Sequence, residues 1–155
     1  MDYHRIETVF RDLALEAGAK RLEIYNSDDF GVETKDDASP VTKADKAADE
    51  IIRAGLDASF PDILTVTEEN SASHVHSAQT FIIVDPLDGT KEFVKRRGDF
   101  TVNIALVEDG VPTRGVVFAP AKERLFYTNA AGASVEESGA QSVGCLLYTS
   151  DAADE

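Results

Sequence analysis

Two aspartates end a strongly apolar run in the middle of the chain. The run Phe-Ile-Ile-Val at positions 81–84 is followed at once by Asp-Pro-Leu-Asp-Gly at positions 85–89. The proline fixes one backbone dihedral and the glycine permits tight geometry, so the second segment is a stiff turn. We expect a buried strand to end at Val84 and the carboxylates of Asp85 and Asp88 to point into one space, which is the arrangement of a binding site.

A third carboxylate belongs to Glu68, which follows another strand signal at residues 63–67. If that strand and the strand at 80–84 are parallel neighbours, their ends bring Glu68 beside Asp85 and Asp88. Three unpaired carboxylates at such a place repel one another, so a cation must lie among them. Oxygen ligands without His or Cys favour Mg²⁺ over zinc or copper. A plain turn is the alternative, because Asp-Pro and Asp-Gly are common turn formers.

Two further segments carry weaker signals of the same chemistry. Thr42 and Asp45 form a T-x-x-D box before an apolar-periodic helix, so a helix cap is the simpler interpretation of Asp45 taken alone. After Gly89, the Thr90 hydroxyl is suited to orient a water, and backbone N–H groups are suited to hold a phosphate oxygen. A Gly-Thr pair by itself is weak evidence.

The elements that must position these residues are two helices and a series of short strands. Apolar spacing of three and four residues predicts a helix from Ile6 to about Tyr25 and a second from Thr42 to Phe60. A strand fragment and a loop are expected over residues 30–40. The Asp109-Gly110 pair predicts a hairpin between two of the strands. Strands are expected at 63–67, 80–84, 100–107, 111–118 and 125–128, which together predict an α+β layered domain with a mostly antiparallel sheet.

Composition bounds the classes of function. The formal charge of the 155 residues is −14, which argues against binding a nucleic acid polymer through a basic face. The longest apolar runs fall short of the roughly 20 residues that a membrane helix needs. The first residues, Met1 to Arg5, lack a basic and apolar leader, so we expect a cytoplasmic protein.

The last eleven residues, CLLYTSDAADE, fit no neighbouring pattern. One reading frame that encodes them resembles a transposon-end sequencing adapter, so residues 145–155 are expected to be a non-native tail. A genuine C-terminus is the alternative. On the first interpretation Cys145, the one cysteine of the chain, is not native, and residues 1–144 are the N-terminal portion of a longer protein.

Three segments together resemble one family. Val41-Thr42-Lys43-Ala44-Asp45, Thr67-Glu68-Glu69 and the run Val84 to Thr90, VDPLDGT, stand in the order and spacing of the inositol monophosphatase superfamily of lithium-sensitive, Mg²⁺-dependent phosphatases. The resemblance covers essentially all of residues 1–144. Lys91-Glu92-Phe93 and the later FTVNIAL at 100–106 are most similar to CysQ-type 3'(2'),5'-bisphosphate nucleotidases within that superfamily.

The resemblance implies a role for each residue of these motifs. Glu68, Asp85 and Asp88 would bind two or more Mg²⁺ ions through carboxylates, and Leu87 through its backbone carbonyl, for two-metal phosphoryl transfer. Asp45 and Thr90 would polarise the attacking water. Gly89 and Thr90 would hold the scissile phosphate by main-chain N–H groups, with Asp88 and Glu68 at the same substrate site. Lys91 would meet a second phosphate, or would simply be a solvated lysine.

The resemblance also implies a substrate and a missing part. The expected reaction converts 3'-phosphoadenosine 5'-phosphate to AMP and phosphate in sulfur metabolism, and the alternative is an inositol monophosphatase or another sugar-phosphate phosphatase. A non-catalytic acidic metal-binding module is the alternative outside enzymes. A further metal-binding aspartate and much of the nucleoside pocket belong to a C-terminal α/β half that this chain lacks, so we expect the 155 residues alone to be nearly inactive. Lithium inhibition and a homodimer are expected for the family, and association with the cytoplasmic face of the inner membrane stays open.

Overall fold

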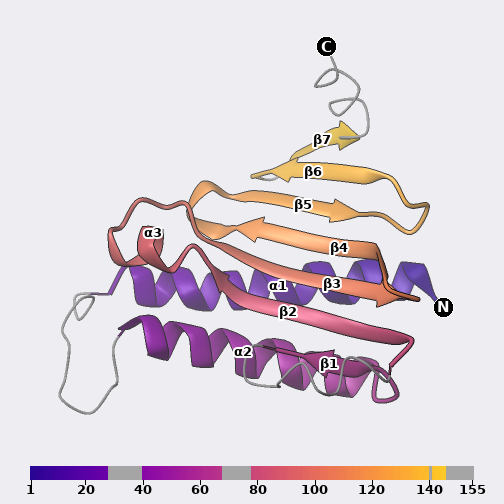
Figure 1. Ribbon diagram of the computed structural model, residues 1–155. Coiled ribbons are helices and arrows are strands. Elements are labelled where there is room, and N and C mark those ends of the chain that lie inside the picture. The colour runs from indigo at the N-terminus through magenta and orange to yellow at the C-terminus, as the bar shows by residue number, and fades with distance from the viewer. Residues whose placement is uncertain (28–39, 68–77, 140, 146–155) are drawn as a thin grey trace.

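A computed structural model describes residues 1–27, 40–67, 78–139 and 141–145 of the chain (Figure 1). The strand fragment and loop expected over residues 30–40 therefore lie outside the described residues, except for Pro40. Glu68 also lies outside them. The described residues form two long helices layered on one sheet, which confirms the α+β class that the sequence predicts.

Both predicted helices are present. Helix α1 spans Tyr3–Tyr25, and the Asp2 side chain caps it by accepting a hydrogen bond of 3.1 Å from the Arg5 N–H. Helix α2 spans Pro40–Ser59, so it begins two residues before the predicted start. Proline suits a first helical position because the N–H that it lacks would have no partner there. Thr42 therefore lies inside the helix and not at its N-cap, so the helix-cap interpretation of Asp45 is wrong.

One mixed sheet carries the described strands in sequence order from β1 to β7. Strands β1 and β2 are parallel, which is the condition that the sequence argument set for bringing their ends together, and every later neighbour is antiparallel. The strands are β1 (Leu64–Val66), β2 (Thr80–Asp88), β3 (Thr101–Glu108), β4 (Val111–Ala119), β5 (Arg124–Thr128), β6 (Ser134–Ser138) and β7 (Gln141–Cys145). A short helix α3 (Thr90–Val94) follows β2, and a 3₁₀ turn η2 (Pro120–Lys122) follows β4. The sequence reasoning missed α3, β6 and β7.

The predicted hairpin joins β3 and β4. Asp109 and Gly110 have φ of 51° and 78°, and they lie between the paired residues Glu108 and Val111. Two successive positive φ values are those of a type I′ turn, whose twist matches the twist of the flanking strands. The Asp-Gly signal in the sequence is thereby confirmed.

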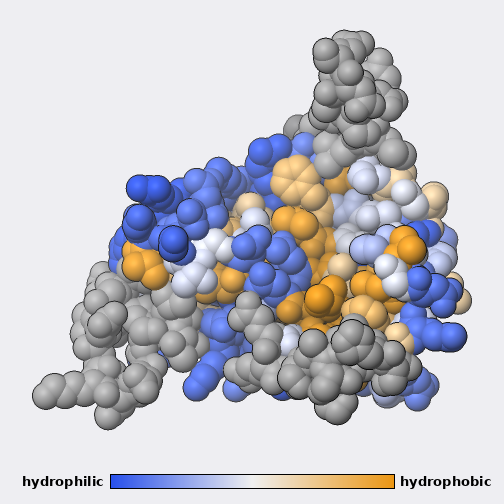
Figure 2. All heavy atoms as spheres, viewed as in Figure 1, coloured by the Kyte–Doolittle hydropathy of each residue, from blue (hydrophilic) through white to orange (hydrophobic). Residues whose placement is uncertain are grey.

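The main core fills the space between the helices and the sheet. Helix α1 packs on β3 and β4, and α2 packs on β2, so both helices cover the same face (Figure 1). On the opposite face, apolar side chains gather over the middle of the sheet (Figure 2), where Ile83 and Val117 are 45% and 39% exposed. None of the helices in the described part is both long and apolar enough to cross a bilayer.

A smaller aromatic cluster anchors α3 beside the end of β2. The rings of Phe93 and Phe100 lie 4.9 Å apart between centroids, and the Tyr25 ring lies 5.0 Å from Phe100 and 5.5 Å from Phe93. Leu87 and Ala44 pack into the same cluster. The cluster joins α1, α2, α3 and β2, so it fixes the relative positions of the elements that carry the candidate site.

Candidate active site

Asp85 and Asp88 lie on β2 itself, not on a turn after it. We expected the strand to end at Val84, but it continues to Asp88 with an irregular register against β3 between the two aspartates. Within the described ranges, β1 last pairs with β2 at Ile83, and beyond that point β2 pairs with β3 alone. Pro86 has no N–H to donate, so it suits a stretch of strand that pairs with one described neighbour. The irregular register sets the spacing of the two carboxylates.

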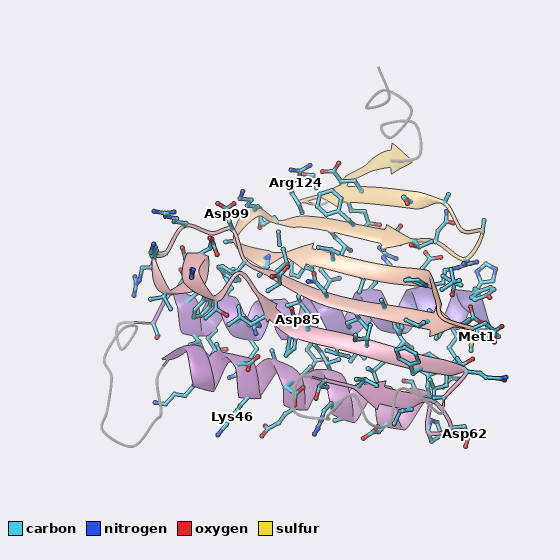
Figure 3. The ribbon with its side chains drawn as sticks, in the orientation of Figure 1. Met1, Lys46, Asp62, Asp85, Asp99 and Arg124 are labelled. Carbon is cyan, nitrogen blue, oxygen red and sulfur yellow. The ribbon has the colours of Figure 1, made fainter. Side chains whose placement is uncertain are left out.

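Local hydrogen bonds hold the side chains of this segment. The Leu87 N–H donates to Asp85 Oδ1 at 3.1 Å, which closes a turn of the kind that Asp favours. On β3, Asn103 lies opposite Asp85 in the register, and its Nδ2 donates to Asp88 Oδ2 at 3.4 Å. Burial raises the pKa of Asp85, and the neighbouring Asp88 charge acts in the same direction. Asp85 is partly buried near the end of β2 that leads to α3 (Figure 3).

Gly89 connects β2 to α3 in a conformation that a side chain would disturb. Its φ is +87°, and a Cβ at this position would lie 2.5 Å from the backbone oxygen of Asp99. Thr90 is the first residue of α3, and Thr90 and Lys91 are both exposed to solvent. Helix α3, which the sequence did not predict, therefore begins directly after the carboxylates.

Asp45 comes to the site from α2 and meets a cation that the sequence reasoning missed. Arg21 on α1 is 0% exposed, and its Nη2 lies 3.5 Å from Asp45 Oδ1, whose side chain is 42% exposed. Burial lowers the pKa of Arg21 to about 10, while the charges of Asp45 and Asp85 oppose that shift. Arg21 therefore stays charged at neutral pH. The signal was present in the sequence, since Arg21 continues the apolar stripe of α1 by one further turn.

Described residues supply only part of the predicted metal site. Asp85 lies within electrostatic reach of Asp45, Asp88 and Arg21, so three of the predicted carboxylates are brought to one region. Among the described residues no group of three or more His, Cys, Asp or Glu side chains forms a metal site, and the predicted ligand Glu68 lies outside them. The parallel pairing of β1 with β2 directs the carboxyl ends of both strands toward the same edge of the sheet.

The donor chemistry of the described atoms suits a hard cation. Asp85 and Asp88 offer carboxylate oxygens, and Asn103 Oδ1 is a buried oxygen with no hydrogen-bond partner in the described part. The sequence reasoning used Asn103 only as part of a similarity. An oxygen-only set of this kind fits Mg²⁺ better than a softer metal.

Comparison with known proteins assigns this chain to a family. The family model described as "Inositol monophosphatase family" matches residues 2–153. The chain belongs to the inositol monophosphatase family.

Members of the inositol monophosphatase family with curated names resemble the chain over most of its length. It is 45% identical over 130 residues to the 3'(2'),5'-bisphosphate nucleotidase CysQ of Salmonella typhimurium, covering 82% of this chain and 53% of that protein. It is 45% identical over 124 residues to the protein of the same name from Buchnera aphidicola, covering 76% and 47%. The chain thus spans about half the length of these relatives.

Solved structures of the same family have the same fold. The crystal structure of CysQ from Bacteroides thetaiotaomicron matches with a TM-score of 0.79 and 37% identity, over 96% of this chain and 56% of that one. An inositol monophosphatase from Zymomonas mobilis matches with a TM-score of 0.74 and 28% identity, over 89% and 52%. The resemblance that the sequence motifs indicated is confirmed at the level of family and fold.

Proposed function

We propose that this chain is part of a Mg²⁺-dependent phosphomonoesterase, a 3'(2'),5'-bisphosphate nucleotidase that converts 3'-phosphoadenosine 5'-phosphate to AMP and phosphate. The observation that carries the proposal is the pair Asp85 and Asp88 at the end of β2, held by hydrogen bonds from Leu87 and Asn103. The similarity to proteins named CysQ supports the choice of a nucleotide substrate. A cytoplasmic location is proposed on the same similarity.

Within this proposal the residues divide into ligands and groups that act on substrate. Asp85, Asp88, Glu68 and the Leu87 carbonyl would hold Mg²⁺, which supplies Lewis-acid stabilisation of the phosphate oxygens when bound. Asn103 keeps Asp88 oriented through its amide N–H.

The remaining roles fall to α2 and to the start of α3. Asp45 and Thr90 are assigned to polarise the attacking water, with the Thr90 hydroxyl orienting it and the Asp45 carboxylate accepting its proton. Gly89 and Thr90 are assigned to bind the phosphate through N–H groups. Lys91 is exposed and is assigned to the second phosphate of a bisphosphate substrate.

An inositol monophosphatase is the second candidate, because the Zymomonas mobilis structure matches this fold with a TM-score of 0.74. Both candidates use the same carboxylates and differ in what lies around the substrate beyond the reacting phosphate. The relative rates on a nucleotide bisphosphate and on inositol 1-phosphate distinguish them.

The substitution Asp88→Asn tests the catalytic role against a passive acidic surface. Changing a partner of a metal ligand already lowers activity about 10- to 100-fold, so losing a ligand should lower kcat by at least about 100-fold. The matched control is Asp109→Asn, because Asp109 is exposed in the β3–β4 turn and its φ of 51° suits Asn equally well. Phosphate release is measured on the complete chain that the source gene encodes. Equal activity of the two variants would contradict an enzymatic role for Asp88.

A further inference from the structure

Arg21 is a fully buried arginine on the core-facing side of α1, at a position where an apolar residue would be expected. The buried positions of α1 run from Ile6 through Phe10 and Ala17 to Arg21, which is 0% exposed. It is the largest of the fully buried side chains in the described part of the chain. Removing a guanidinium from water is expensive, so such a group persists where neighbouring negative charge compensates it.

The negative charge that compensates Arg21 is the carboxylate group of the candidate site. The hydrogen bond from Arg21 Nη2 to Asp45 Oδ1 is long at 3.5 Å, and the charge of Asp85 also acts on Arg21. Its Nε and Nη1 are buried without a hydrogen-bond partner among the described residues. A guanidinium that makes so few hydrogen bonds interacts with its surroundings chiefly through charge.

We propose that Arg21 is a positioning residue that acts through Asp45 and Asp85, as a fixed counter-cation that keeps the acidic site assembled and lowers its affinity for Mg²⁺. Neighbouring carboxylates repel each other unless a positive charge lies among them. Because Arg21 is fixed by burial in α1, it supplies that charge permanently. The same charge repels a divalent cation at Asp85 and Asp88. The inference rests on the proposed phosphatase function, which makes these carboxylates ligands.

This role has a signature that a purely structural ion pair lacks. Removing the charge of Arg21 should tighten Mg²⁺ binding, because the repulsion disappears. The same change should lower kcat at saturating Mg²⁺, because Asp45 loses the group that orients it. A structural defect would weaken binding and turnover together.

Four variants of the complete chain carry the test. Arg21→Met fits the apolar stripe, and Arg21→Gln is a second neutral variant in case the first does not fold. Arg21→Lys keeps the charge. The control is Arg11→Met, since Arg11 is another ion-paired arginine of α1, bound to Glu137 at 2.6 Å and ten residues before Arg21, about 15 Å along the helix axis.

Mg²⁺ binding without substrate is measured by titration calorimetry, and kcat and KM by phosphate release. Removing a buried unit charge that acts on Asp45 and Asp85 removes repulsion of a bound cation, so we expect Kd for Mg²⁺ to fall about tenfold in Arg21→Met and Arg21→Gln. Arg21→Lys and Arg11→Met should stay near the wild type, with kcat lowered only in the neutral Arg21 variants. Unchanged or weaker Mg²⁺ binding in those variants, with an active wild type, would overturn this inference alone. A wild type that neither binds Mg²⁺ nor releases phosphate would overturn the proposed function with it.

Discussion

Replacing Gly89 by alanine tests whether the backbone geometry at the end of β2 is required for the site. Gly89 lies between Asp88 and Thr90 with φ of +87°. An alanine there must adopt a left-handed conformation, which costs about 1–2 kcal/mol for a residue with a Cβ. Its Cβ would also lie 2.5 Å from the Asp99 backbone oxygen and 3.1 Å from the Phe100 Cα.

The close approach adds to the conformational penalty. Neither neighbouring atom is the end of a flexible side chain, so the backbone itself must shift, and overpacking of this kind costs roughly 1–3 kcal/mol. We therefore expect Gly89→Ala to lower the free energy of unfolding by roughly 2–5 kcal/mol. The shift would also displace Asp88 and Thr90, so activity should fall even where the protein remains folded.

Gly110→Ala is the matched control for the conformational penalty. Gly110 also has a positive φ, of +78°, but a Cβ there would meet no atom within 4 Å. Gly110→Ala should lower the free energy of unfolding by only about 1–2 kcal/mol and should retain activity. Denaturant unfolding of both variants measures the two losses, and their difference isolates the close approach. Equal losses, or an active Gly89→Ala variant, would refute the reasoning.

Two further predictions concern stability away from the site. The hydroxyl of Thr113, followed by that of Tyr3, holds the pKa of Glu108 below its ordinary value of 4.5, so the group stabilises the fold above that pH and the contribution is lost as pH falls. Glu108→Gln should therefore be less stable than the wild type at pH 7 in denaturant unfolding, with a difference that shrinks below pH 4.5; a constant difference would contradict this. Gly18→Ala should lower the unfolding free energy by about 1 kcal/mol despite better helix propensity, because its Cβ would lie 2.4 Å from the Phe118 ring. Adding Phe118→Leu should remove that extra loss, and an equal loss in both backgrounds would refute the steric cause.

Local pattern was sufficient to locate the helices, the hairpin and the two aspartates. Periodicity found α1 and α2, and the Asp-Gly pair found the turn at Gly110, because these signals depend on neighbouring residues alone. The parallel pairing of β1 with β2 was a condition of the sequence argument and not a prediction, because no local pattern distinguishes parallel from antiparallel neighbours. The strand end at Val84 was wrong because the pairing on one side of β2 stops earlier than on the other, which only the sheet reveals.

The features that were missed depend on distant contacts. Helix α3 has five residues, which is too short for periodicity, and β6 contains one apolar residue in Ser-Val-Glu-Glu-Ser. Arg21 was missed because an arginine on a helix is ordinarily solvated, and its burial follows from the packing of α1 against the sheet. Asn103 gained a role only when the register placed it opposite Asp85. The roles of Glu68, Thr90 and Lys91 stay predictions.

The most direct test of the central claim is phosphate release by the complete chain from 3'-phosphoadenosine 5'-phosphate and from inositol 1-phosphate, with and without Mg²⁺. The account predicts release that requires Mg²⁺, AMP as the nucleotide product, and a higher kcat/KM for the nucleotide. A higher kcat/KM for inositol 1-phosphate would contradict the proposed substrate. Absence of Mg²⁺-dependent release from either compound would contradict the phosphatase itself.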